Sequence, residues 1–405
     1  MFQLVLIDRT IVLIGVFMGL REPLCRYRPS VYALDPVVTR AISLTSPDAG
    51  SRTIGSDLLP YWLLFMLWSA GAVQTERRGM QNARLLFFVG ATILTTLIIG
   101  LRFEVGGDWG AYQRMYNDIF FLSLPNALTT TDSGYAALNW LAAQIGLDIT
   151  FVNLVCAMLF MSGLARLAWR QPNPALAILV AVPYFIIVVA MGYTRQAAAI
   201  GIICFAIADT SERHLIRLVI LIGIAALFHK TAILILPIAL VPVFRRNVLL
   251  GGIGILLFII LFMLLLRDNS DKLLTNYVQG DYDSQGAAIR AAMNVVPAVI
   301  FFILRKRIDL PPFVKSFWAT CAVLSIVSVF ALATASASSG IDRLSLYIIP
   351  LQLVVYSRLP YILSSNGRAM PSILMAVVAY SFLVQFVWLN YAQNVEYWLP
   401  YTASL

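Results

Sequence analysis

The stretch Leu85-Leu-Phe-Phe-Val-Gly-Ala-Thr-Ile-Leu-Thr-Thr-Leu-Ile-Ile-Gly-Leu-Arg-Phe-Glu-Val-Gly-Gly-Asp-Trp109 decides the class of this protein. Its first part is apolar and, with its flanks, long enough to cross a bilayer, for which a helix needs roughly 20 residues. Arg102, Glu104 and Asp108 then follow closely, among glycines that allow sharp bends. The pattern favours a spanning helix that ends in a polar segment able to hold a polar substrate. The alternative is a solvated turn beside interfacial aromatic residues.

The composition of the whole chain supports a membrane protein. Of its 405 residues, 60% are hydrophobic and only 12% are charged, whereas soluble domains are about half apolar and a quarter charged. The net charge of +9 does not imply a nucleic-acid partner, because Lys and Arg collect in the cytoplasmic loops of membrane proteins. Cys156, Cys204 and Cys321 lie inside apolar runs, and Cys25 stands alone. We predict neither a disulfide nor a cysteine metal site.

The sequence divides into three parts. Residues 1–57 form an N-terminal extension, interpreted as an interfacial anchor, an irregular arm or the product of an early start codon. Residues 392–405 form a short outward-facing tail. Residues 58–391 form one all-α, polytopic transmembrane domain with about twelve predicted spans. The apolar runs lie at about 58–74, 85–101, 149–169, 174–191, 196–209, 214–228, 231–244, 248–266, 290–304, 314–334, 343–357 and 371–391.

The distribution of basic residues predicts the orientation. Lys and Arg are concentrated in alternate short connections, such as Arg77-Arg78 and Arg305-Lys306-Arg307. These connections are predicted to be cytoplasmic. The other connections face outward, and two of them, 102–148 and 267–289, are long. Within the first, apolar residues at 135, 138, 141, 142 and 145 predict one face of an interfacial or re-entrant helix.

Two motifs at predicted outer membrane edges carry candidate chemistry. In Gly192-Tyr-Thr-Arg-Gln-Ala-Ala-Ala-Ile-Gly201, Arg195 lies near a helix start, where a guanidinium and free backbone N–H groups suit an anion. The alternative is an arginine that snorkels to lipid headgroups. In Leu227-Phe-His-Lys-Thr-Ala232, His229 could transfer a proton near neutral pH. The alternative is a hydrogen-bonded interfacial histidine.

Two further arginines, Arg290 and Arg343, also face outward in this topology. Charges at a membrane edge are costly and often mark a substrate path. Asp281-Tyr-Asp283 has the spacing of a metal-dependent nucleotide-sugar site. Nucleotide sugars are cytoplasmic, however, and this loop is predicted to face outward. We therefore predict no metal site and no cofactor.

Three ordered stretches together resemble the EpsG-type, Wzy-like family of bacterial polysaccharide polymerases, which make O-antigen or exopolysaccharide. They are Arg102…Val105-Gly-Gly-Asp-Trp109…Tyr112, then Tyr193-Thr-Arg-Gln-Ala197…Ala199, then Phe228-His-Lys-Thr-Ala232. The resemblance covers roughly residues 58–391. Gly107 departs from the pattern, in which a threonine or a similar residue is expected.

The resemblance implies a membrane glycosyltransferase with GT-C-like architecture in the bacterial inner membrane. Its substrate would be an oligosaccharide repeat unit on undecaprenyl diphosphate, polymerised without a metal at a site that faces the periplasm. A chain-length regulator and a flippase of the same exopolysaccharide or O-antigen biosynthesis pathway are the implied partners, beside the lipid bilayer.

The implied chemistry assigns roles to the motif residues. A lipid diphosphate leaves as an anion and needs cations, which Arg102, Arg195, Lys230, Arg290 and Arg343 can supply. The attacking hydroxyl needs a base, for which Asp108 and His229 are the candidates. Sugar contacts fall to Trp109, Tyr112, Tyr193 and Gln196.

Two other functions stay open on the residues alone. A lipid-linked oligosaccharide flippase or other transporter would use the same cations, but it should carry them deep within several spans and show two related halves. An O-antigen ligase differs only in its acceptor, a lipid A core. Only the resemblance favours polymerase over ligase.

Overall fold

A computed structural model describes residues 54–404, apart from 75–80, 212–213, 267–286, 335–344 and 366. Nearly all of the N-terminal extension therefore lies outside the described residues, as does most of the second long outer loop. The described residues form helices and turns, with no β-strand beyond an isolated bridge between Arg102 and Ala403. The all-α prediction is confirmed for this part of the chain.

The helices follow one another along the chain with short connections. They are α3 (Ile54–Gln74), α4 (Gln81–Gly100), α5 (Trp109–Ile119), α6 (Leu124–Ala127), α7 (Ser133–Gln144), α8 (Ile149–Trp169), α9 (Pro174–Ala181), the π-helix η1 (Val182–Ala190), α10 (Thr194–Ala208), α11 (Leu215–Phe228), the 3-10 helix η3 (Lys230–Leu234), α12 (Ile235–Phe244), α13 (Val248–Leu266), α15 (Ala287–Leu304), α16 (Pro312–Thr334), α18 (Pro350–Tyr356), α19 (Leu359–Ile362), α20 (Pro371–Tyr391) and the 3-10 helix η6 (Val395–Trp398).

Apolar helices dominate the described residues, as expected for a membrane protein. Four are long and apolar enough to cross a bilayer: Gln81–Gly100, Ile149–Trp169, Pro312–Ala331 and Pro371–Tyr391. Shorter apolar helices of 10–17 residues accompany them. They include the runs predicted at 196–209, 214–228 and 231–244, which form α10, α11 and η3–α12.

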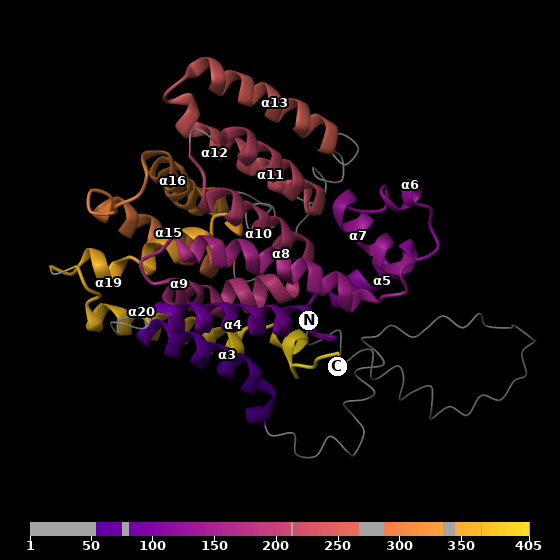
Figure 1. The fold of residues 1–405 in the computed structure, drawn as a ribbon, viewed down its shortest axis with the longest axis horizontal. Coiled ribbons are helices and arrows are strands. Elements are labelled where there is room, and N and C mark those ends of the chain that lie inside the picture. The colour runs from indigo at the N-terminus through magenta and orange to yellow at the C-terminus, as the bar shows by residue number, and fades with distance from the viewer. Residues whose placement is uncertain are drawn as a thin grey trace, which may run out of the picture. The chain divides into compact units, whose positions relative to one another are not determined.

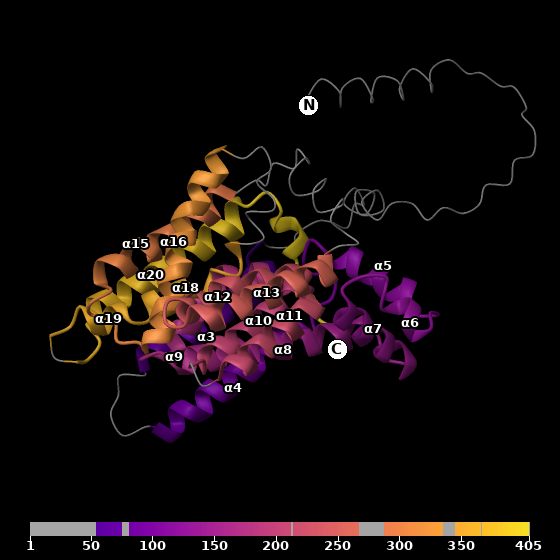
Figure 2. The ribbon, with the colours of Figure 1, turned by 90° about the horizontal axis from the view of Figure 1, so that it is seen from above.

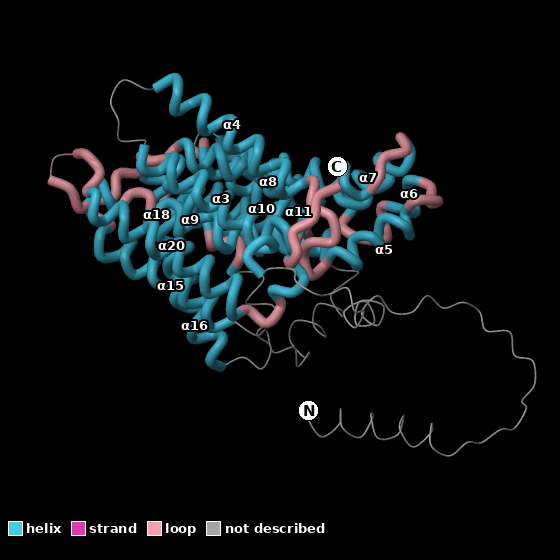
Figure 3. Tube along the Cα trace, turned by 90° about the horizontal axis from the view of Figure 1, so that it is seen from below, coloured by secondary structure: helices cyan, strands magenta, loops and turns pink. Residues whose placement is uncertain are grey.

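Successive long helices run back and forth, so their connections alternate between two ends (Figure 1). Helices α5, α6 and α7 gather at one end, here called the α5–α7 end, and α19 lies toward the other, the α19 end (Figures 1 and 2). The described loops lie mainly toward these two ends (Figure 3). The predicted helix within 102–148 is present as α7. Its buried side differs, however, because Tyr135, Ala136 and Asn139 are buried while Leu141 and Ile145 are exposed.

Helices α8 and α10 cross at the centre of the bundle through glycine. A Cβ atom on Gly163 would lie 1.7 Å from the carbonyl oxygen of Gly201, and one on Gly201 would lie 2.3 Å from Cα of Phe160. Both obstacles are backbone atoms, which cannot rotate away. Small residues therefore allow the two helices to approach closely. This crossing sets the position of α10, whose first turn carries Arg195.

Replacing Gly201 with Leu is expected to prevent this approach and to destabilise the protein by about 3 kcal/mol or more, as in overpacked cores. A thermal melt of the purified protein in detergent measures the loss. Gly90→Leu in α4 is the matched control, because nothing lies within 4 Å of a Cβ at that position. Equal melting temperatures for the two variants would contradict the glycine crossing.

The C-terminal tail packs against the α5–α7 end. The backbone N–H of Gly106 donates to the carbonyl of Tyr397 over 2.8 Å, and that of Phe103 donates to Thr402 over 2.9 Å. Trp398 is buried, and its indole N–H donates to the carbonyl of Ile187 in the π-helix over 2.8 Å. The tail thus satisfies a polar group of irregular helix in an apolar interior, where an unpaired carbonyl is costly.

Candidate functional site

A buried carboxylate at the α5–α7 end joins two of the motifs. Asp132 immediately precedes α7, and its Oδ2 accepts a hydrogen bond from Nη1 of Arg195 over 2.9 Å. The same oxygen lies 3.5 Å from Nδ1 of His229. Its Oδ1 accepts from the backbone N–H of Lys230 over 3.2 Å. Asp132, Arg195 and His229 are here called the Asp132 cluster.

The guanidinium of Arg195 is supported from several sides. Its central carbon lies 5.8 Å from the ring centroid of Tyr112 and 5.9 Å from that of Tyr135, within the range of cation–π attraction. Nη1 also donates to Oγ1 of Thr131 over 2.7 Å. The side chain keeps 23% of its surface exposed. Arg195 is therefore held in one orientation and still reaches solvent, as a residue that binds an anion must.

The protonation state of Asp132 follows from its neighbours. Burial by itself would raise the pKa of this carboxyl. The hydrogen bond and charge of His229, the charge of Arg195 and the N–H of Lys230 outweigh burial, so the pKa lies below its usual value. Asp132 is thus anionic at neutral pH and a weak base. Its chemical role is to orient and stabilise the groups around it.

His229 is the better candidate for the base. A carboxylate beside Nδ1 favours the tautomer that carries its proton there, which leaves Nε2 as the acceptor. A base oriented by a third group is the arrangement used by activated nucleophiles in many enzymes. The 3.5 Å separation exceeds a normal hydrogen bond, and such contacts commonly tighten when substrate binds.

Arg102 lies beneath the cluster and has only 1% of its surface exposed. Its side chain donates to the carbonyls of Ile99 over 2.5 Å and Val105 over 3.3 Å, and to Oγ1 of Thr194 over 2.6 Å. These bonds tie the end of α4 to the first residue of α10. The structure thus places Arg102 where it orders the segment that carries Arg195.

The adjacent loop requires glycine at one position. Gly106 has φ = +108°, and a Cβ there would lie 2.3 Å from the carbonyl oxygen of Met191. Any other residue would be strained in this conformation and would push the loop away from the start of α10. Gly107, where a threonine was expected, faces Trp398 instead, with ring atoms 3.9 Å from its would-be Cβ.

The remaining motif residues of this end surround the cluster at different depths. Tyr112 is buried and supports Arg195 from below. Burial and the negative charge of Asp108 raise the pKa of Tyr112 to about 12, so Asp108, which is half-buried, acts on the same ring. Trp109 is also half-buried and packs against Phe103, with 5.6 Å between ring centroids.

Four other predicted residues are less defined by geometry. Tyr193 is half-buried and Gln196 is buried, and both flank Arg195 in sequence. Arg290 belongs to α15, but its side chain lies outside the described residues. Arg343 and the Asp281-Tyr-Asp283 stretch lie outside them entirely. Lys230 contributes its backbone N–H, as noted above.

Sequence reasoning missed Asp132. An aspartate directly before a helix is usually interpreted as an N-cap, which uses its carboxylate on the helix N–H groups. Here the side chain makes no such capping hydrogen bond. It turns instead to Arg195 and His229, so only a test of the cap geometry could have revealed its role.

The EpsG family model matches residues 85–403, which is more than half of the chain. This chain belongs to the EpsG family. The matched region contains all three motifs, Asp132 and the tail that packs against Gly106. Family membership indicates a polysaccharide polymerase of glycosyltransferase type, embedded in a membrane. Searches of curated proteins and of solved structures found no significant match.

Proposed function

We propose that the Asp132 cluster catalyses chain growth in polysaccharide synthesis. The growing chain would pass from undecaprenyl diphosphate to a sugar hydroxyl of a new lipid-linked repeat unit. The observation that supports this most directly is the convergence of Arg195 and His229 on Asp132 in a chain of the EpsG family. These three side chains supply the two requirements of the reaction, a cation for the leaving group and an oriented base.

The reaction balances on these residues. The acceptor hydroxyl oxygen attacks the anomeric carbon of the donor from the side opposite the diphosphate. The bond between that carbon and the diphosphate oxygen breaks, and the diphosphate leaves with the electron pair. Nε2 of His229 takes the hydroxyl proton, and Asp132 stabilises the resulting imidazolium. Arg195 pairs with the charge that develops on the leaving oxygens. The anomeric centre is inverted.

The proposal includes an orientation in the inner membrane. The α19 end, which carries many of the basic connections, faces the cytoplasm by the positive-inside rule. The α5–α7 end then faces the periplasm, where lipid-linked repeat units are presented after flipping. The bundle of about twelve spans in this reading is of the GT-C-like class.

Incubating the purified protein with lipid-linked repeat units tests the proposal. A ladder of products is expected, and it should disappear in His229→Gln, which keeps the size of the side chain but cannot take the proton. Transfer only to a lipid A core would instead identify a ligase. Movement of the lipid across vesicles without any product would identify a transporter.

Polymerisation is expected to continue unchanged in EDTA. The physical reason is that Arg195 already provides the positive charge that a divalent cation would supply to the diphosphate. Ladder length with and without EDTA measures this, and a calcium- and magnesium-free buffer serves as the reference. Loss of the ladder in EDTA, followed by recovery with Mg²⁺ or Mn²⁺, would contradict the proposed chemistry.

A further inference from the structure

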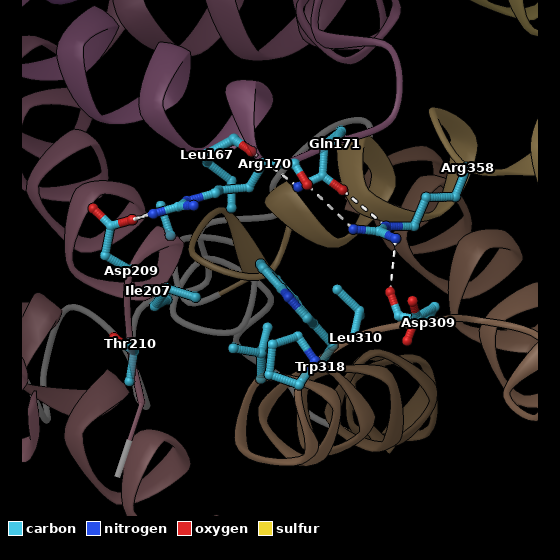
Figure 4. A pocket seen from close by; sticks show the side chains of 13 residues that line it. Leu167, Arg170, Gln171, Ile207, Asp209, Thr210, Asp309, Leu310, Trp318 and Arg358 are labelled. Carbon is cyan, nitrogen blue, oxygen red and sulfur yellow. Dashed lines mark hydrogen bonds and ion pairs between the residues drawn. The ribbon is translucent and has the colours of Figure 1, made fainter. Parts of the chain in front are cut away.

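A second polar pocket lies at the α19 end, away from the Asp132 cluster. It has a volume of about 290 Å³ and is lined by the ends of α8 and α10, by the connection that precedes α16 and by Arg358 (Figure 4). Arg195 and Asp209 lie near opposite ends of α10. At about 1.5 Å of rise per residue, they are roughly 20 Å apart along the helix axis. The reaction proposed above makes no use of this pocket.

Arg358 enters the pocket with its charge balanced only by neutral acceptors. Its Nε donates to Oε1 of Gln171 over 2.9 Å, Nη1 donates to the carbonyl of Asp309 over 2.8 Å, and Nη2 donates to the carbonyl of Arg170 over 3.3 Å. Among the described residues, no ion pair joins it to a carboxylate. A guanidinium has five N–H groups, so two remain for a ligand. Burial lowers the pKa of Arg358, and the charge of Asp309 opposes this.

Two more arginines share a single carboxylate at the rim of the same pocket. Nε of Arg166 donates to Oδ2 of Asp209 over 2.8 Å, and Nε of Arg170 donates to Oδ1 over 2.9 Å. Nη2 of Arg170 also contacts Oδ1. The arginine side chains stay 42% and 52% exposed. One positive charge of this group is therefore in excess.

The charges around the pocket favour an anion with one negative charge. The excess in the Arg166–Arg170–Asp209 group and the charge of Arg358 together contribute two positive charges. Asp309 is exposed beside Arg358 and contributes one negative charge. The remaining single positive charge matches a phosphodiester, whereas a free phosphate dianion would also be repelled by Asp309.

We propose that this pocket binds the phosphodiester headgroup of an anionic phospholipid from the adjacent leaflet. Two of its walls are the ends of α8 and α16, which are among the helices long and apolar enough to span a bilayer. Basic pockets between spanning helices are typical sites for such headgroups. The arginine forks of Arg170 and Arg358 match phosphate oxygens. The volume lies at the lower end for ligand pockets, which suits a headgroup rather than a whole lipid.

The test uses the thermal melt of the purified full chain in a neutral detergent. Short-chain phosphatidylglycerol is expected to raise the melting temperature in a saturable manner. Short-chain phosphatidylcholine and inorganic phosphate, at matched ionic strength, are expected to produce little change. Equal stabilisation by inorganic phosphate would show that the site takes a free anion and would overturn the lipid assignment. Equal stabilisation by phosphatidylcholine would overturn the role of charge.

Variants locate the effect in the pocket. Arg170→Gln should weaken the apparent affinity for phosphatidylglycerol about tenfold, the value of one charge-assisted hydrogen bond. Arg305→Gln is the matched control, because this arginine is exposed at the same end and does not line the pocket. Asp309→Asn should strengthen binding by removing the repulsion. Arg358 is avoided because its bonds join three segments, and its loss could prevent folding.

An unchanged affinity in Arg170→Gln, or an equal loss in Arg305→Gln, would refute the site. The assay contains no polysaccharide substrate. Its outcome is therefore independent of whether the Asp132 cluster catalyses polymerisation.

Discussion

Replacing Asp132 with Asn is expected to reduce the rate of polymer formation by about 10²-fold or more, the contribution typical of an oriented proton-transfer group. The substitution keeps the size of the side chain and an oxygen that can accept from Lys230. It removes the negative charge that holds Arg195 at 2.9 Å and that lies 3.5 Å from His229. His229 then loses the group that stabilises its protonated form. Ladder formation at matched membrane abundance measures the effect.

Thr131→Val is the comparison for this variant. It removes only the neutral hydrogen bond that Thr131 accepts from Arg195, so a loss of less than about tenfold is expected. The two variants alter neighbouring residues and the same arginine, which separates the charge of Asp132 from simple support of the guanidinium. Near-normal ladders from Asp132→Asn would show that the carboxylate is only a structural contact.

The pH dependence of the cluster follows from the lowered pKa of Asp132. A carboxyl whose pKa falls on folding stabilises the protein above its unfolded pKa, and this contribution is lost as the pH falls through the lower, folded value. The pair of Asp132 with Arg195 therefore persists at neutral pH and through mild acid. Loss of activity in mild acid should come instead from protonation of the base, His229.

Replacing Arg195 with Lys is expected to lower turnover by about 10²-fold although the positive charge is kept. Lysine is a point charge on a flexible stem, whereas the guanidinium is a planar fork that matches phosphate oxygens. Lysine would also lose part of the contact with the rings of Tyr112 and Tyr135. Because the arginine acts on charge that develops in the transition state, the loss should appear in kcat more than in KM.

Arg114→Lys is the matched control for Arg195→Lys. Arg114 lies on α5 at the same end of the bundle, and it is exposed. An arginine that only reaches lipid headgroups can be replaced by lysine without loss. If Arg195→Lys behaved like Arg114→Lys, with full-length ladders from both, Arg195 would be a membrane anchor and not a catalytic residue.

Local patterns in the sequence predicted the helices and the residues of the motifs, but not their relation to one another. The apolar runs predicted α8 and α10 because bilayer-crossing helices need long apolar segments. They did not predict that these helices meet at Gly163 and Gly201, since a glycine in a helix can equally face lipid, as Gly90 does. The sequence also grouped Arg102 with Arg195 on one side of the membrane, but could not show that Arg102 is buried beneath it.

The sequence by itself determined the membrane class, the all-α fold and the family resemblance, because these depend on composition, on the length of apolar runs and on short motifs. Tertiary structure alone decided the site. Asp132 lies 63 residues from Arg195 and 98 from Lys230 along the chain. No local pattern links residues so far apart. They meet because α7, α10 and η3 end at the same side of one bundle, where a buried carboxylate must find positive partners.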